Sequence, residues 1–80
     1  MQLNEAIDLV TVEHDRACRR YPLGYHSTHE GYGVLAEEVA ELLDAIRAND
    51  IRSCRDEAVQ VAAVAVRFLV ELCASPAEDM

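Results

Sequence analysis

The sequence predicts an all-α chain of three helices that completes an antiparallel helical bundle by dimerisation. Hydrophobic residues fill 51% of the 80 positions and aromatic residues only 5%, so the apolar side chains are mainly Ala, Val and Leu. This composition favours packed helices, and three Gly and two Pro are too few for the turns of a many-stranded β fold. A chain of this length forms one domain, residues 1–80, with a small core.

Residues 3–20 are the first predicted helix. Its seam residues recur at alternating steps of four and three, which places them on one face of a helix. These residues are Leu3, Ile7, Val10, His14, Ala17 and Tyr21. Asn4 is the expected N-cap, and Pro22 and Gly24 are expected to end the helix and open a loop.

Residues 29–48 are the second predicted helix. Ser27 and Glu30 have the spacing of a capping box, and Asn49 can adopt the left-handed conformation that ends a helix. Between these signals the apolar side chains form one stripe at helical spacing. The stripe consists of Leu35, Val39, Leu42 and Ile46.

Residues 53–74 are the third predicted helix, with a capping box expected at Ser53 and Asp56. From Ala58 to Val70 the only strongly polar residues of this helix are Gln60 and Arg67. A helix that is apolar over so wide an arc must be covered on several sides, which two neighbouring helices of a short chain do poorly. We therefore expect a homodimer or a higher homo-oligomer, associated through the second and third helices.

The charge of the chain limits its partners. Fifteen acidic residues against seven basic ones give a net charge of −8 and a pI near 4.6. This balance argues against nucleic acid and an anionic membrane as partners and is compatible with a hard cation held by carboxylates. The three cysteines form no CxxC pair, which indicates reduced thiols in a cytoplasmic protein. The longest apolar run, Val61–Val66, is too short to cross a membrane.

Acidic residues cluster on the second predicted helix at Glu37, Glu38, Glu41 and Asp44. The short connection makes the second and third helices antiparallel neighbours, so Glu38 and Glu41 can converge with polar groups of the third. Those groups are Glu57 and Gln60. Oxygen ligands from two antiparallel helices suit Mg²⁺, and the alternative reading of the cluster is a solvated acidic face.

Two segments carry a resemblance to a known family. Residues 29–42 and 57–67 look like the MazG-type all-α nucleoside triphosphate pyrophosphohydrolases, whose signature is ExxE on one helix and ExxD on the next. Glu38 and Glu41 match the ExxE, and Glu57 matches the first position of the ExxD. The resemblance therefore implies a single MazG-like helical domain.

Gln60 is the departure from that pattern, because it stands where the family has the Asp of its second helix. A Gln carbonyl can still ligate Mg²⁺, but it brings no charge and cannot serve as a base. Asp44 is a candidate for the missing carboxylate.

The resemblance implies Mg²⁺-dependent cleavage of a nucleoside triphosphate to a monophosphate and pyrophosphate, with Mn²⁺ as the alternative ion and nucleotide house-cleaning as the role. The metal ligands that it implies are Glu38, Glu41, Glu57 and Gln60. The catalytic candidates for orienting the attacking water are Glu37, Glu38 and Glu41. A metal must bridge carboxylates and a triphosphate because the two repel each other.

The end of the first helix supplies candidates for binding the nucleotide. Arg16 and Arg19 can clamp phosphates, and Tyr21 can stack on a base. The alternative role for the arginines is a favourable interaction with the dipole at the helix C-terminus. Two other functions stay open: a phosphoribosyl-nucleotide pyrophosphohydrolase, which would share the acid pattern, and a non-catalytic helical dimer that serves as an interaction module.

Overall fold

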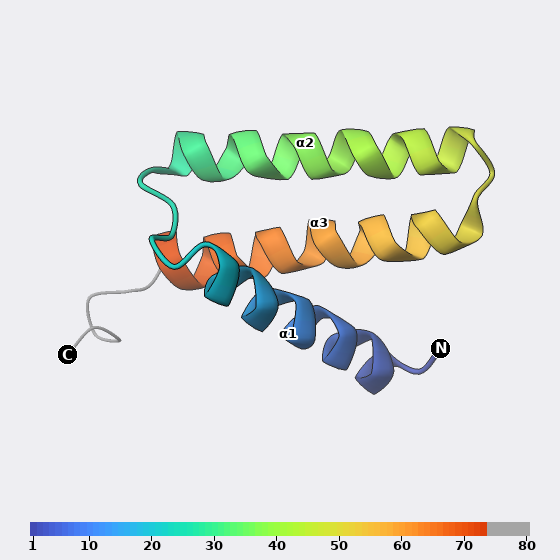
Figure 1. The fold of residues 1–80 in the computed structure, drawn as a ribbon, viewed down its shortest axis with the longest axis horizontal. Coiled ribbons are helices and arrows are strands. Elements are labelled where there is room, and N and C mark those ends of the chain that lie inside the picture. The colour runs from blue at the N-terminus through green and yellow to red at the C-terminus, as the bar shows by residue number, and fades with distance from the viewer. Residues whose placement is uncertain (74–80) are drawn as a thin grey trace.

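The computed structural model describes residues 1–73 and contains three α-helices within them. They are α1 (Leu3–Arg20), α2 (Thr28–Arg47) and α3 (Ile51–Leu72), and the described residues form no strand. Helices α2 and α3 lie side by side as an antiparallel hairpin, and α1 crosses below α3 and diverges from it toward the N-terminus (Figure 1). The predicted all-α fold is thus confirmed.

The ends of α1 and α2 agree with the sequence signals to within one residue. The Ser27 hydroxyl accepts a hydrogen bond of 3.1 Å from the Glu30 N–H, as the capping-box spacing predicts. Asn49 has a φ of 56°, so it adopts the expected left-handed conformation after α2. Gly24 also has a positive φ, of 67°, in the loop between α1 and α2.

Two predicted N-caps are wrong. The N-cap of α1 is Gln2 and not Asn4, which already lies inside the helix. Helix α3 begins two residues earlier than predicted, because the Asp50 carboxylate accepts hydrogen bonds from the N–H of Ser53 at 3.1 Å and from its hydroxyl at 2.8 Å. The Ser53 hydroxyl is then a donor to the cap and cannot be the cap itself. The predicted end of this helix at residue 74 lies outside the described residues.

Helix α3 is the central element of the fold. Both α1 and α2 pack on α3, and within residues 1–73 their backbones do not approach each other. Gly31 permits the close approach of α2 to α3, because a Cβ there would lie 2.6 Å from Cδ2 of Phe68 and 3.0 Å from Cδ1 of Leu72. This contact explains a glycine in the first turns of a helix, where glycine is otherwise unfavourable.

The core of the described chain is thin. Ala45 and Ala63 are its buried hydrophobic side chains, and no large side chain is fully buried. Several apolar side chains are strongly exposed on both helices of the hairpin, including Val39, Leu43, Ile46, Val66, Leu69 and Val70. Within residues 1–73 the apolar arc of α3 is therefore only partly covered, as the sequence predicts, while dimerisation stays a prediction. Among residues 1–73, no helix combines the length and apolar character that crossing a membrane requires.

Candidate functional site

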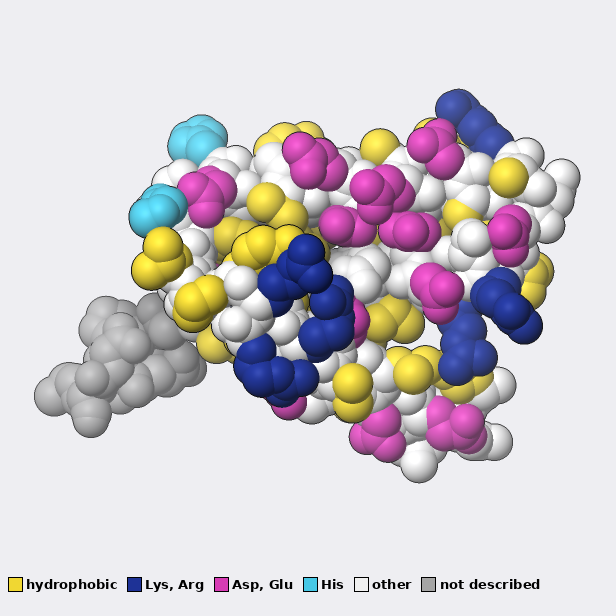
Figure 2. Space-filling model, in the orientation of Figure 1, with side chains coloured by type: hydrophobic (Ala, Val, Ile, Leu, Met, Phe, Trp, Pro, Cys, Tyr) yellow, Lys and Arg dark blue, Asp and Glu magenta, His cyan; other side chains and the backbone are white. Residues whose placement is uncertain are grey.

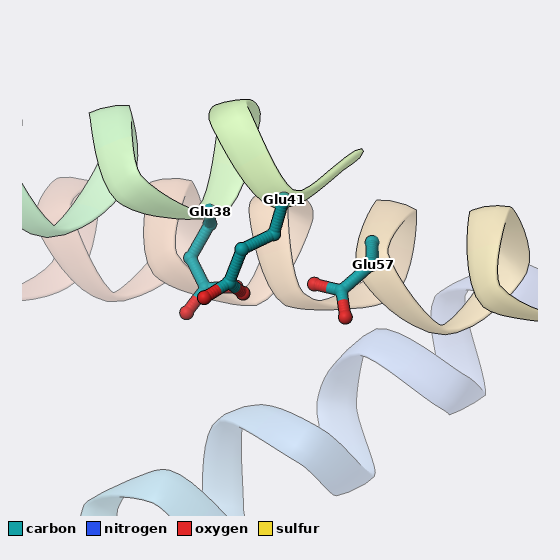
Figure 3. Close-up of side chains that lie close together, drawn as sticks. All are labelled: Glu38, Glu41 and Glu57. Carbon is teal, nitrogen blue, oxygen red and sulfur yellow. The ribbon is translucent and has the colours of Figure 1, made fainter. Parts of the chain in front are cut away.

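Three carboxylates converge between α2 and α3. Glu38, Glu41 and Glu57 each contribute an oxygen, and these oxygens all lie within 4.8 Å of one another. Glu38 and Glu41 are three residues apart on α2 and therefore share a face, and the antiparallel hairpin brings Glu57 of α3 opposite them (Figure 3). The convergence that the sequence predicts for these three residues is present in the structure.

The electrostatics of this carboxylate cluster are unfavourable without a cation. Burial, reinforced by the charge of Glu41, raises the pKa of Glu38 to about 7. The pKa of Glu57 is also raised, by burial and then by Glu41. Oε2 of Glu38 and Oε2 of Glu57 are buried and make no hydrogen bond within the described part of the chain. Buried polar atoms are normally paired, so these two oxygens point to a missing partner.

The donor set fits a hard divalent cation. All three groups are carboxylates, and Mg²⁺ and Mn²⁺ prefer oxygen ligands of this kind. Oxygens within 4.8 Å of one another can reach a common ion with small side-chain movements, because ligand oxygens lie about 2.0–2.1 Å from Mg²⁺. The acidic residues Glu37 and Asp44 are exposed and lie outside the cluster.

A cleft of about 610 Å³ adjoins the carboxylate cluster. The C-terminal turn of α1, the loop after it, α2 and α3 form its walls. Among its lining residues are Arg16, Arg20, Tyr21, Tyr25, Glu38 and Gln60. Two of the three predicted nucleotide-binding residues, Arg16 and Tyr21, therefore line the cleft, whereas Arg19 is exposed and does not. Figure 2 shows the basic side chains at the end of α1 directly below the acidic side chains of the hairpin.

Arg16 is not a free cation. Its Nε lies 2.9 Å and its Nη2 2.6 Å from the two oxygens of Glu13, a pairing that the sequence reasoning missed although the residues are three positions apart on one helix. The hydrogen bond from Arg16 lowers the pKa of Glu13, and Gln60 contributes to the same lowering. Gln60 therefore lies beside a carboxylate of α1 as well as in the cleft that Glu38 lines.

A second polar cluster holds the cleft wall in place. Arg67 is 5% exposed, and its Nε donates to Oε2 of Glu71 at 2.6 Å, an i,i+4 pair on α3. Its other nitrogens donate to the carbonyls of Ala17 at 3.3 Å and Tyr21 at 2.5 Å, at the end of α1. Glu71 also accepts from the Tyr25 N–H at 2.9 Å. This Arg67–Glu71 clasp fixes the loop that carries the two tyrosines.

Burial alone would raise the pKa of Glu71, but the hydrogen bonds from the Tyr25 backbone and Arg67 outweigh it and lower that pKa. The Arg67 guanidinium also stacks over the Tyr25 ring, 5.3 Å from its centroid. The polar role of Arg67 at the end of α1 was invisible in sequence, because its carbonyl partners lie about fifty residues away.

Comparisons of the chain with protein families, with characterised proteins and with solved structures find no match.

Proposed function

We propose that this protein is a Mg²⁺-dependent nucleoside triphosphate pyrophosphohydrolase. The observation that carries the proposal is the carboxylate cluster of Glu38, Glu41 and Glu57 at the edge of a cleft, in which two buried oxygens have no hydrogen-bond partner among residues 1–73. The resemblance of the same residues to the ExxE and ExxD signature supports the choice of reaction. Gln60, in the position of the signature Asp, lines that cleft.

Glu38, Glu41 and Glu57 would hold the cation, with the Gln60 carbonyl as a neutral donor beside them. When bound, Mg²⁺ would neutralise charge on the phosphates and polarise the phosphorus that is attacked. The protein's own contribution is to assemble the carboxylates in advance, at the cost of their mutual repulsion.

In the proposed reaction a water molecule attacks the α-phosphorus, and its oxygen forms the new O–P bond. The bond from the α-phosphorus to the bridging oxygen of the β-phosphate breaks, and pyrophosphate leaves with that electron pair. A carboxylate takes the proton of the attacking water. The candidates are Glu38, which lines the cleft, and the exposed Glu41 and Glu37. The arginines at the end of α1 and the loop tyrosines would hold the nucleotide.

The test is pyrophosphate release from a panel of nucleoside triphosphates in the presence of Mg²⁺. We expect the wild type to release pyrophosphate and Glu41→Gln to lose at least about 100-fold in rate, because a carboxylate that holds the metal is removed. Asp8→Asn, which removes an exposed carboxylate from α1, is the matched control and should retain the wild-type rate. Absence of pyrophosphate release from every nucleotide would overturn the proposal.

The second candidate function is a non-catalytic helical module. Gln60 favours it, because the cleft then has one carboxylate fewer than the signature provides. On this alternative, Mg²⁺ binds at the carboxylate cluster but no nucleotide is hydrolysed, so the same assay combined with a Mg²⁺ titration separates the two functions.

We also propose that the protein self-associates through the exposed apolar face of the hairpin. Val39, Leu43 and Ile46 recur at helical spacing on the side of α2 opposite Glu41, and Leu69 of α3 is 64% exposed. Contiguous apolar surface of this kind is uncommon on monomers. Sedimentation should give a dimer or a larger species, and Leu43→Lys should shift it to the monomer. A wild-type monomer at micromolar concentration would refute this part of the proposal.

A further inference from the structure

Glu13 of α1 is a largely buried carboxylate that the proposed reaction does not use. Its side chain is only 14% exposed, although α1 is the outermost helix of the described chain. Both of its oxygens accept hydrogen bonds from Arg16, at 2.6 and 2.9 Å. A carboxylate that is so far withdrawn from water is expected to have further hydrogen-bond donors, and one of them lies on α3.

That donor is Gln60. Glu13 and Gln60 both line the main cleft and also a second hollow of about 590 Å³, so together they form the boundary between the two spaces. The pKa of Glu13 is lowered first by the hydrogen bond from Arg16 and further by one from the Gln60 side chain, against the opposing effect of burial. The packing of α1 on α3 thus brings a carboxylate to the position at which the chain departs from the ExxD signature.

The chemistry of the two side chains decides which end of the Gln60 amide meets Glu13. An ionised carboxylate can only accept hydrogen bonds, so the amide nitrogen of Gln60 must be the end that faces it. The nitrogen and the oxygen of an amide diverge from the same carbon atom. When the nitrogen is directed to Glu13 on α1, the carbonyl oxygen is therefore directed away from α1 and toward the α2–α3 hairpin.

The carboxylate cluster lies on the hairpin side of Gln60. Glu57 precedes Gln60 by three residues on α3, which makes the two side chains neighbours on the helix surface. Glu38 lines the same cleft as Gln60. We infer that Glu13 is a positioning residue of the cation site, which holds the amide nitrogen of Gln60 so that the carbonyl oxygen faces the carboxylate cluster.

The inference rests on the proposed function and explains why a Gln occupies the position of the signature Asp. An Asp at this position would lie beside the like charge of Glu13, which is unfavourable. A Gln instead has an N–H for Glu13 and a carbonyl oxygen for the cation. Helix α1 is then part of the cation site, although none of its side chains belongs to the carboxylate cluster.

The experiment is a double-mutant cycle in Mg²⁺ affinity, measured by calorimetric titration of the full chain. Glu13→Gln should weaken Mg²⁺ binding by about tenfold, because the new amide can donate or accept and no longer orients the ligand at Gln60. In the Gln60→Asp background the same substitution should cost at most about twofold, because a carboxylate has no nitrogen to be oriented. Gln is nearly isosteric with Glu and Arg16 is half-exposed, so we expect the variant to fold.

The matched control is Asp8→Asn, which removes an exposed carboxylate from α1 and should bind Mg²⁺ within about twofold of wild type in both backgrounds. A second measurement tests the hydrogen bond without metal. The side-chain amide signals of Gln60, identified by their loss in Gln60→Asp, should shift in the ¹⁵N–¹H spectrum of Glu13→Gln and stay in place in that of Asp8→Asn.

Equal losses of Mg²⁺ affinity in the two backgrounds would mean that Glu13 acts only as a nearby charge, and would overturn the inference. Unchanged Gln60 amide signals in Glu13→Gln, or a wild type that binds no Mg²⁺, would overturn it as well. The outcome is separable from that of the proposed function. Coupling between Glu13 and Gln60 without any nucleotide hydrolysis would support the inference and refute the enzyme, and hydrolysis without coupling would do the reverse.

Discussion

Two polar clusters lie on α3, and they differ in how their charges are satisfied. At the Arg67–Glu71 clasp, a buried guanidinium meets one carboxylate and two backbone carbonyls, and the same carboxylate accepts a backbone N–H. At the carboxylate cluster, three like charges gather and two buried oxygens have no partner within residues 1–73. The first arrangement holds the fold together. The second costs stability, and such a cost is typical of a functional site.

The clasp should give the largest effect when it is broken. Arg67→Ala leaves Glu71 partly buried without its cation and removes the donor to the Tyr21 carbonyl, so we expect a loss of about 3–5 kcal/mol in the free energy of unfolding. Urea unfolding measures this loss. Arg47→Ala, at an exposed position, should change stability by less than about 0.5 kcal/mol. A comparably small change in Arg67→Ala would mean that the clasp does not hold the fold.

Without a bound cation, the contribution of the carboxylate cluster to the free energy of unfolding should fall as the pH rises. The pKa of Glu38 is raised from 4.5 to about 7 in the folded chain, so between these values the folded state binds more protons than the unfolded state. Without a divalent cation, the contribution of Glu38 to stability should therefore be fully present below about pH 4.5 and be lost as the pH rises through 7, by on the order of 2 kcal/mol.

Thermal melting between pH 5 and pH 8 in the presence of a chelator checks this expectation. Glu38→Gln, which cannot ionise, should flatten the dependence, whereas Asp8→Asn should leave it unchanged. A melting temperature that rises across this range in wild type would show that the Glu38 carboxyl is not held in the protonated form by its surroundings.

Gln60→Asp adds a carboxylate at the position where the ExxD signature has its Asp. The new charge should lower the stability of the metal-free chain by about 0.5–1 kcal/mol, through repulsion from its acidic neighbours. It should tighten Mg²⁺ binding by up to about tenfold and raise the rate of pyrophosphate release. If wild-type turnover equals or exceeds that of the variant, Gln60 is a working part of the site and not a defect.

Local sequence signals account for the helices and for the three acids of the cluster. The helical period of the apolar residues locates α1, α2 and α3. The ends of α2 are predictable because the side chain of Ser27 caps a nearby N–H and the backbone of Asn49 readily adopts the left-handed conformation. The hairpin register then follows from the short connection, which explains why Glu57 could be placed opposite Glu38 and Glu41 from sequence.

Features that depend on contacts between distant parts of the chain could not be predicted from local sequence signals. The carbonyl partners of Arg67 are set by how α1 crosses α3. The caps at Gln2 and Asp50 were missed for a local reason. Asn4 is a stronger capping residue than Gln2, and Ser53 is about as good a capping residue as Asp50.

The central claim is that Glu38, Glu41 and Glu57 form a cation site, and a Mg²⁺ titration by calorimetry and thermal melting tests it most directly. We predict a single saturable Mg²⁺ site in wild type, with a gain of about 2.7 kcal/mol in unfolding free energy at one hundred times its Kd. Glu41→Gln should weaken binding at least about tenfold, whereas Glu37→Gln, at the exposed neighbouring position, should bind within about twofold of wild type. Equal Mg²⁺ affinity and equal stabilisation in wild type and Glu41→Gln would contradict the account and reduce these acids to a solvated face.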